Sequence, residues 1–318
     1  LAARRDRPGR TAVDVDLPPA GSAFLVWGAD REGLPASRPL GGGGAVTALD
    51  GEWRLDPGSP NALVIGRWLA RAEDGPDEWV EMVPGAWSYQ LPTEPDRPYP
   101  IPVRYRIAFQ VEDVPGSLRL LVDGFAGLEW TLEVNGSRCT ASPEPSGVDS
   151  QIGAVDIRPL VRAGENVLEL RLVVADATDG LLDLVKLVGD FRLAGADGAW
   201  RIARPDEAAR PAPWTEQGYP FLSSTATYST EVDLSAGGRL ILDADAGDDV
   251  LEVVVNGETA GVRLWPPYAV EITGQVRPGP NVIELRVANT AQNLLGGTAR
   301  PSGLRGAPRI VVHAEAEP

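Results

Sequence analysis

The chain repeats one pattern of strands and turns along its length. An alternating run that contains a tyrosine begins each copy, VRYRIAFQV with Tyr105 or ATYSTEVDL with Tyr228, and an Asn-Gly pair then follows at Asn135 or Asn256. Each copy continues into a Gly-x-Asn loop, with Asn166 in the first and Asn281 in the second. The residue numbers put the two copies roughly 120 residues apart, whereas solenoid units usually repeat every ~20–50 residues. The repeat therefore predicts two β-domains of one design in tandem.

Each copy is divided into short alternating runs separated by turn residues, which is typical of an all-β sandwich. We expect the first sandwich over residues 49–195 and the second over 214–318, joined by a connector at 196–213. The segment LDGEWRL, with Trp53, is predicted to open the first sandwich. The remaining strands are expected near 103–111, 117–122, 128–134, 166–174 and 186–193, and then near 225–234, 239–244, 250–256, 259–264, 268–272, 281–288 and 309–312.

Two segments precede the first sandwich. Within residues 1–28, the run TAVDVDLPPAGSAFLVW predicts a short hairpin, which we interpret as the terminal strands of an upstream domain because a lone hairpin is marginal in water. Residues 29–48 contain four consecutive glycines and are predicted to form a flexible linker.

The Asn-Gly pairs and the Gly-x-Asn loops are interpreted as structural. A two-residue type I′ turn needs positive φ at both central positions, which asparagine and glycine supply most readily. The asparagine of each Gly-x-Asn loop carries an amide that can bridge backbone groups across the loop.

Four residues of the second sandwich are candidates for carbohydrate binding. Trp265 and Tyr268 flank the pair Pro266-Pro267, and an aromatic ring on a stiff loop suits stacking against the apolar face of a pyranose. Asn289 and Asn293 follow the last long strand and offer amides to sugar hydroxyls. The alternative is that Trp265 plugs the sandwich edge, that Tyr268 begins an inward-facing strand, and that both asparagines satisfy backbone groups. We favour this alternative, and it predicts that Trp265→Ala destabilises the protein as a core truncation does.

No catalytic or metal site is predicted. The single histidine, His313, gives little support to a histidine-based triad or zinc site. The acidic run Asp243, Asp245, Asp248 and Asp249 has chemistry suited to calcium, but it lacks the spacing of an EF-hand loop and is interpreted as a solvated turn. The chain contains many carboxylates, so a catalytic acid–base pair stays possible. The sequence does not give the distance between two carboxyl groups that a glycosidase requires.

Charge and composition restrict the partners. The formal net charge is −16, which argues against nucleic acid or an anionic membrane, since phosphates require clustered cations. No apolar run approaches the ~20 residues of a membrane helix, and the polar residues that follow Leu1 do not form the apolar core of a signal peptide. The lone Cys139 excludes an intrachain disulfide without deciding the compartment. Between a cytoplasmic and an extracytoplasmic location, we favour an extracytoplasmic one, either secreted or periplasmic.

These motifs resemble a known family of enzymes. The runs WTEQGYPFLSSTATYSTEVDL, VNGETAGVRLWPPYAVEIT and RPGPNVIELRVAN look like the galactose-binding-like jelly-roll domain of glycoside hydrolase family 2, and like the C-terminal sandwich of family 106 α-L-rhamnosidase-like enzymes. LDGEWRL, LEVNG and VDIRPLVRAGENVLEL match the same pattern more loosely. The resemblance implies two tandem jelly rolls, and it places the catalytic acid and base on a separate (β/α)₈ barrel that these residues do not contain.

Three functions therefore stay open. The first is a noncatalytic C-terminal region of a large bacterial glycoside hydrolase, whose partners are the catalytic domain of the same polypeptide and carbohydrate. The second is an autonomous carbohydrate-binding module. The third is a β-sandwich glycosidase or lyase, for which no activated group is recognisable.

Overall fold

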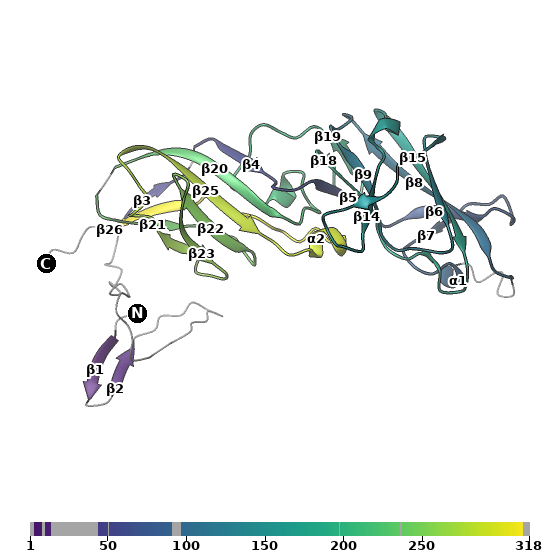
Figure 1. Ribbon diagram of the computed structural model, residues 1–318. Coiled ribbons are helices and arrows are strands. Elements are labelled where there is room, and N and C mark those ends of the chain that lie inside the picture. Colours follow the sequence, from purple (N-terminus) through teal and green to yellow (C-terminus); the bar gives the residue numbers. More distant parts are fainter. Residues whose placement is uncertain are drawn as a thin grey trace.

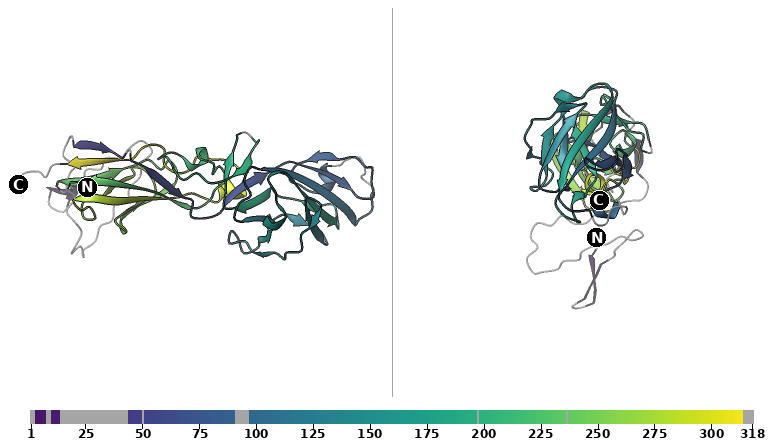
Figure 2. Two further views of the ribbon diagram at one scale, coloured as in Figure 1. Left: turned by 90° about the horizontal axis from the view of Figure 1, so that it is seen from above. Right: turned by 90° about the vertical axis from the view of Figure 1, so that its right-hand side faces the viewer.

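The computed structural model describes residues 3–7, 10–13, 44–49, 51–90, 97–196, 198–235 and 237–313. It is an all-β protein in which two sandwiches lie end to end in an elongated molecule (Figures 1 and 2). The described helices are single turns, α1 (Trp87–Gln90) and α2 (Gln292–Leu295), with 3₁₀ turns at Arg158–Leu160 and Trp214–Glu216. None of the described helices is long and apolar enough to cross a membrane.

The first sandwich is formed by an eight-stranded sheet and a five-stranded sheet. The larger sheet contains β12 (Ser137–Arg138), β11 (Trp130–Val134), β15 (Gly164–Val174), β8 (Ile101–Val111), β6 (Trp68–Ala72), β7 (Val80–Met82), β19 (Arg201–Ala203) and β18 (Arg192–Ala194). The smaller contains β13 (Glu144–Pro145), β14 (Gly153–Asp156), β9 (Leu118–Val122), β17 (Val185–Gly189) and β5 (Asn61–Ile65). A short pair, β10 (Phe125–Ala126) with β16 (Gly180–Leu181), lies beside them.

The second sandwich is formed by a five-stranded and a four-stranded sheet. In sheet order the first is β23 (Glu258–Arg263), β22 (Val250–Val255), β25 (Gly279–Ala288), β20 (Thr225–Leu234) and β4 (Trp53–Asp56). The other is β24 (Ala269–Glu271), β21 (Arg239–Asp243), β26 (Arg309–His313) and β3 (Ala45–Ala48).

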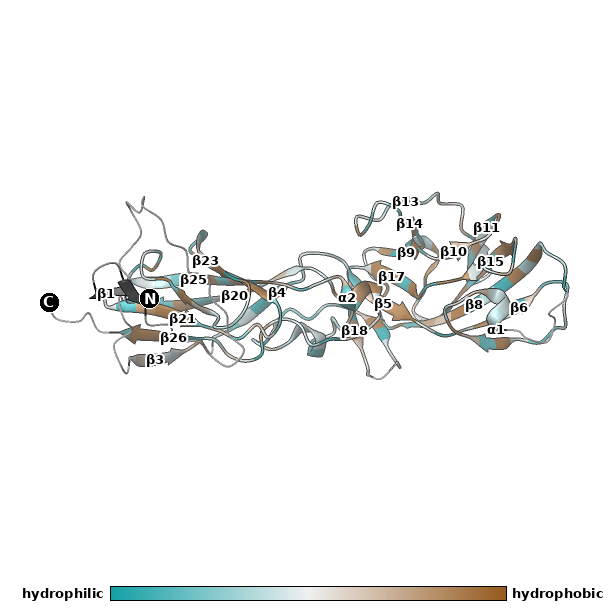
Figure 3. Cartoon of the chain, turned by 90° about the horizontal axis from the view of Figure 1, so that it is seen from below, coloured by the Kyte–Doolittle hydropathy of each residue, from teal (hydrophilic) through white to brown (hydrophobic). Residues whose placement is uncertain are grey.

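Period-two alternation explains the two cores. Along β8 every odd-numbered residue from Ile101 to Val111 is buried, and its even-numbered neighbours are more exposed. The same alternation runs along β15 and β25, so one face of each strand contributes to a core between two sheets. Figure 3 shows hydrophobic and hydrophilic residues interleaved along the strands of both sandwiches.

The two sandwiches share one topology. The strands of the second sandwich each have an equivalent in the first that makes the same pairings. In chain order, β3, β4, β20, β21, β22, β23, β24, β25 and β26 correspond to β5, β6, β8, β9, β11, β12, β14, β15 and β17, respectively. The Asn-Gly pairs lie at equivalent hairpin tips, with φ values of 54° at Asn135 and 52° at Asn256. Both glycines that follow also have positive φ, as the predicted type I′ turns require.

The opening strands belong to a different sandwich from the one predicted. Trp53 and its neighbours in β4 pair with β20 of the second sandwich, and residues 45–48, predicted as flexible linker, form β3 and pair with β26. The first sandwich is thus inserted between the second and third strands of the second one. Because pairing partners so distant in sequence are chosen by tertiary contacts, the order of motifs along the chain did not show this.

The remaining boundaries also differ in part. Residues 201–203 of the predicted connector form β19, which pairs in parallel with β8. At the N-terminus, β1 (Ala3–Arg7) and β2 (Arg10–Val13) pair with each other. This pair is not the hairpin predicted over 11–27, of which only residues 11–13 are described, and these pair with β1. Residues 14–27 lie outside the described residues.

The buried asparagines fasten each sandwich in the same way. The Asn256 amide nitrogen donates to the Asn281 side-chain oxygen at 2.8 Å and to the Gln275 carbonyl at 2.9 Å. The Asn281 amide nitrogen donates to the Arg277 and Gly279 carbonyls at 2.8 and 2.7 Å. Asn135 and Asn166 repeat this arrangement, with 2.8 Å between their amides. We call each pair an asparagine clamp.

Removing the buried member of a clamp is expected to destabilise its sandwich. Asn281→Ala removes a fully buried side-chain amide and leaves the backbone groups of its loop without their internal partners, which costs about 1–3 kcal/mol of unfolding free energy. Asn166→Ala is expected to cost a similar amount. Urea unfolding measures both, with Glu258→Ala, an exposed position on β23, as the control. An Asn281→Ala protein that unfolds at the parent's urea concentration would contradict the clamp.

Candidate functional site

The four candidate residues lie at the end of the second sandwich that faces the first. Tyr268, from the β23–β24 loop, shares its one hydroxyl proton between the carbonyls of Gly247 and Asp249, whose oxygens lie 2.9 and 2.7 Å from the hydroxyl oxygen. The Asp249 carboxylate accepts from the Gly303 N–H at 2.9 Å. The loop of Tyr268 is thereby joined through residues 247–249 to the segment that follows Asn289 and Asn293.

Tyr268 is part of the core. Its side chain is 3% exposed, and burial raises the pKa of its hydroxyl to about 12, so the hydroxyl remains a neutral donor. Both of its hydrogen bonds go to backbone carbonyls inside the protein. A pyranose therefore has no free ring face to stack on.

Trp265 does not plug the sandwich, and our prediction for this residue is wrong. Its side chain is 40% exposed, beside the exposed Leu264. The reason is that Trp265 lies in the β23–β24 loop, beyond Arg263 at the end of the edge strand β23, and so does not occupy an inward-facing position of a strand.

Asn289 and Asn293 bind backbone groups. The Asn289 amide donates to the Leu222 carbonyl at 2.9 Å and accepts from the Ser224 N–H at 2.9 Å. Asn293 is 2% exposed and donates to the carbonyls of Pro220 and Arg300 at 3.1 and 2.8 Å. The turn that carries them is therefore committed to structure.

The carboxylates of the acidic run bind other groups of the protein. Asp243 pairs with Arg309 at 2.7 Å, and Asp248 pairs with Arg300 at 3.1 Å. Asp245 accepts from the Gly247 N–H at 2.8 Å. Within the described ranges, no group of three or more His, Cys, Asp or Glu residues is arranged to hold a metal ion.

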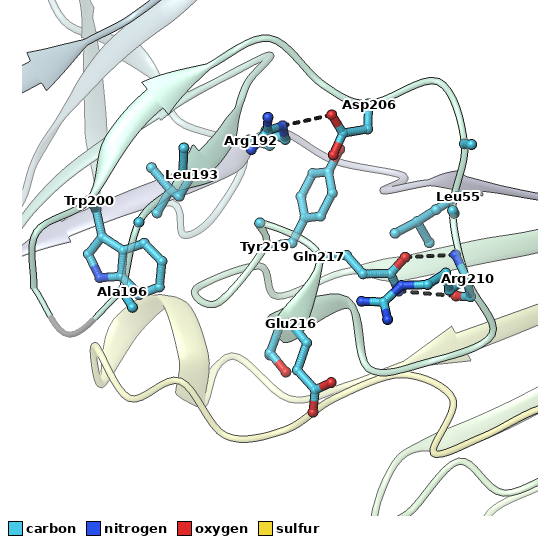
Figure 4. A pocket seen from close by; sticks show the side chains of 16 residues that line it. Leu55, Arg192, Leu193, Ala196, Trp200, Asp206, Arg210, Glu216, Gln217 and Tyr219 are labelled. Atoms are coloured by element: carbon cyan, nitrogen blue, oxygen red, sulfur yellow. Dashed lines mark hydrogen bonds and ion pairs between the residues drawn. The ribbon is translucent and has the colours of Figure 1, made fainter.

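A pocket lies where the two sandwiches meet (Figure 4). It has a volume of about 620 Å³, and its walls come from both sandwiches and from the segment between them. Arg192, Leu193 and Trp200 belong to the β18–β19 hairpin, Leu55 to β4, and Asp206, Arg210, Glu216, Gln217 and Tyr219 to the segment before β20. We call it the junction pocket.

The junction pocket combines an aromatic wall with paired charges. The Arg192 guanidinium Nε lies 3.0 Å from the Asp206 carboxylate. Burial, together with the Asp206 charge, raises the pKa of the Tyr219 hydroxyl, and Arg192 opposes that shift. Trp200 is half-buried and stands edge-on to Phe221, with 6.3 Å between ring centroids. In Figure 4 the Tyr219 ring points toward Asp206.

Two features hold the pocket walls in place. The Gln217 side chain accepts from the Arg210 N–H at 2.8 Å and donates to the Ala212 carbonyl at 2.9 Å, which fixes the loop around it. Gly218 has a φ of +91°, and its carbonyl accepts from the Leu193 N–H of the first sandwich at 2.8 Å. A Cβ at this position would lie 2.9 Å from that of Arg192, so only glycine permits the approach.

The sequence did not indicate this pocket, because residues 196–213 were predicted to form a connector. The available signal was the pair of tryptophans, Trp200 and Trp214, at the borders of that segment, since large aromatic residues are uncommon in solvated linkers. Their partners lie in both sandwiches and were not recognisable from the sequence.

The chain is similar to a known protein over a short stretch. No family model matches the chain. Over 86 residues, or 26% of this chain, the sequence is 29% identical to a putative beta-glucuronidase of Formosa agariphila, of which the match covers 7%. The chain thus spans a small part of this relative.

Similar solved structures are also glycoside hydrolases. A rhamnosidase from Novosphingobium sp. PP1Y is 24% identical and has a TM-score of 0.30, covering 66% of this chain and 22% of that one. Streptomyces avermitilis α-L-rhamnosidase is 17% identical with a TM-score of 0.34, covering 82% and 27%. A β-D-mannosidase from Dictyoglomus thermophilum is 12% identical with a TM-score of 0.33, covering 72% and 31%. The chain spans less than a third of each of these structures.

Truncation of Tyr268 is expected to destabilise the protein more than truncation of Trp265. Tyr268→Ala removes a buried ring and its hydroxyl, which costs roughly 3–5 kcal/mol, whereas Trp265→Ala removes a ring that is already partly in water. Tyr268→Phe, which leaves two carbonyls without their donor, is expected to cost about 1–3 kcal/mol. Chemical denaturation compares the three variants. Equal losses from the two alanine variants would contradict this assignment.

Asp249 is expected to make stability depend on pH. Burial raises the pKa of its carboxyl above the ordinary value of 3.8, against the opposing effects of the Gly303 N–H, Arg305 and Arg300, while Asp248 adds to the increase. An acid with a raised folded-state pKa contributes its full stability below the unfolded pKa and loses it as pH rises through the folded pKa.

The Asp249→Asn variant tests this dependence, because the amide oxygen still accepts from Gly303. Its unfolding free energy, relative to that of the parent, is expected to increase from about pH 4 to pH 7. Asp248→Asn serves as the control, since the Asp248 side chain is 76% exposed. A constant difference between Asp249→Asn and the parent over this range would contradict the prediction.

Proposed function

We propose that this chain is a noncatalytic accessory region of a glycoside hydrolase. In this role the two sandwiches form one rigid body that braces a separate catalytic domain of the same polypeptide and presents carbohydrate to it. The sequence motifs and the 86-residue match to a putative beta-glucuronidase support the assignment to a glycoside hydrolase.

The observation that carries the accessory role is the use of side chains at the inner end of the second sandwich. Tyr268, Asn289 and Asn293, which suit ligand binding by residue type, direct their polar atoms to backbone groups of the protein. A group whose hydrogen bonds are internal gains little by exchanging them for hydrogen bonds to a ligand. This end thus acts as a support for the neighbouring sandwich.

Rigidity is supported by a core that continues across the junction. Phe221 and Leu294, which belong to the second sandwich by sequence, are buried in the hydrophobic cluster of the first. The Asn61 amide of β5 donates to the Phe191 and Gly218 carbonyls at 3.0 and 2.9 Å, and so binds both sides of the junction. The chain also crosses the junction twice, because the first sandwich is an insertion in the second.

Turnover measurements test the noncatalytic role. The chain is expected to release no nitrophenol from 4-nitrophenyl β-D-glucuronide, α-L-rhamnoside, β-D-mannoside or β-D-galactoside. A polypeptide that carries these sandwiches together with a (β/α)₈ domain is expected to hydrolyse one of them. Steady hydrolysis by the two sandwiches alone, lost on substitution of a carboxylate of this chain, would overturn the proposal.

The shared core predicts that the sandwiches unfold together. Leu294→Ala removes a contact across the junction and is expected to cost about 2–4 kcal/mol, with both sandwiches remaining in a single transition. Leu295→Ala, in the same helical turn but 37% exposed, is the matched control and should cost much less. Urea unfolding followed by tryptophan fluorescence and by backbone hydrogen exchange measures the effect. Two separate transitions in the parent protein would contradict a common rigid body.

A further inference from the structure

We propose that the junction pocket binds a neutral saccharide unit, a role that rests on the proposed function and assigns its carbohydrate contact to a site away from Trp265 and Tyr268. The pocket is a concave space between two β-sandwiches. Its volume of about 620 Å³ lies within the ~300–1,000 Å³ typical of small-ligand sites. Ligand sites also occur preferentially where two domains meet.

The chemistry of the walls fits a saccharide. Trp200 supplies an apolar surface for the C–H face of a sugar ring, because the indole is half-buried and held edge-on by Phe221. Across the pocket, Arg192 offers N–H donors and Asp206 offers carboxylate acceptors. Neighbouring hydroxyls of a sugar both donate and accept hydrogen bonds, so they can accept from the Arg192 guanidinium and donate to the Asp206 carboxylate.

The balance of charge favours a neutral ligand. Arg192 and Asp206 neutralise each other at 3.0 Å, and Arg210 and Glu216 add one further charge of each sign to the lining. An anionic ligand would meet no net positive charge here, in a chain whose formal charge is −16. A purely apolar ligand would remove these polar groups from water without replacing their hydrogen bonds.

The pocket is preorganised, which lowers the entropic cost of binding. Its two sides are joined by the hydrogen bond from Leu193 N–H to the Gly218 carbonyl at 2.8 Å. Asn61 reinforces the same contact from behind, and the Gln217 amide fixes the loop that carries Arg210. The distance between the pocket walls is therefore fixed before the sugar binds.

Binding is tested by titrating the whole chain with L-rhamnose, D-galactose, D-mannose and cellobiose, followed by NMR and calorimetry. A single aromatic wall with a few hydroxyl contacts is expected to give a Kd in the high-micromolar to millimolar range, about −4 to −6 kcal/mol. Shifts from at least one neutral sugar should centre on Trp200 and Tyr219. Saturation by D-glucuronate alone, or no response to any sugar at about 20 mM, would overturn the proposal.

Variants separate this pocket from the Trp265 loop. Trp200→Ala and Asp206→Asn are each expected to weaken binding by at least about tenfold, which equals about 1.4 kcal/mol. Asp206 has a side chain that is 64% exposed, so its substitution tests the pocket even if Trp200→Ala fails to fold. Trp265→Ala is the matched control and should leave the Kd unchanged.

The opposite pattern, with binding lost in Trp265→Ala and kept in Asp206→Asn, would overturn the assignment of the site. NMR shifts at the junction pocket that are caused only by another protein domain, and by none of the sugars, would overturn the assignment of the ligand as a saccharide. Neither result alters the turnover measurements, which test the noncatalytic role separately. The failure of this inference is therefore distinguishable from the failure of the proposed function.

Discussion

In each sandwich a buried asparagine amide fastens the loop before the longest strand to the tip of a neighbouring hairpin. Asn281 is fully buried, so its hydrogen bonds to Asn256, Arg277 and Gly279 are made away from competing water. The clamp fixes where β25 begins relative to β22, and β25 in turn pairs with β20 over its whole length. Register along the centre of the sheet therefore depends on this one contact, and the first sandwich repeats it at Asn166.

The insertion of one sandwich into the other determines the molecule's shape. Since the chain leaves the second sandwich after β4 and returns before β20, the inner end of that sandwich must accommodate two crossings and the body between them. The side chains at this end accordingly bind backbone groups, as Asn289 and Asn293 do. Leu294 continues the first sandwich's core across the boundary. An end that would be open in a single jelly roll is here a structural interface.

The same insertion creates the junction pocket. The β18–β19 hairpin extends the first sandwich's sheet, while the residues from Asp206 to Tyr219 return to the second sandwich. Gly218 lets these two surfaces approach closely on one side, and the pocket opens beside that contact. A polar, charge-balanced hollow at a rigid boundary is thus a consequence of the topology, and neither sandwich alone contains it.

The sequence by itself determined the all-β class, the long strands, the duplication and the hairpin tips, because period-two patterns and Asn-Gly turns act through neighbouring residues. It also indicated Tyr268 as an inward-facing residue. Tertiary structure alone decided that β3 and β4 belong to the second sandwich, that Trp265 lies in a loop in partial contact with water, and that Trp200, Asp206 and Tyr219 come together. These features depend on strands and loops far apart in the chain, and local patterns carry no record of which distant partner a strand will choose.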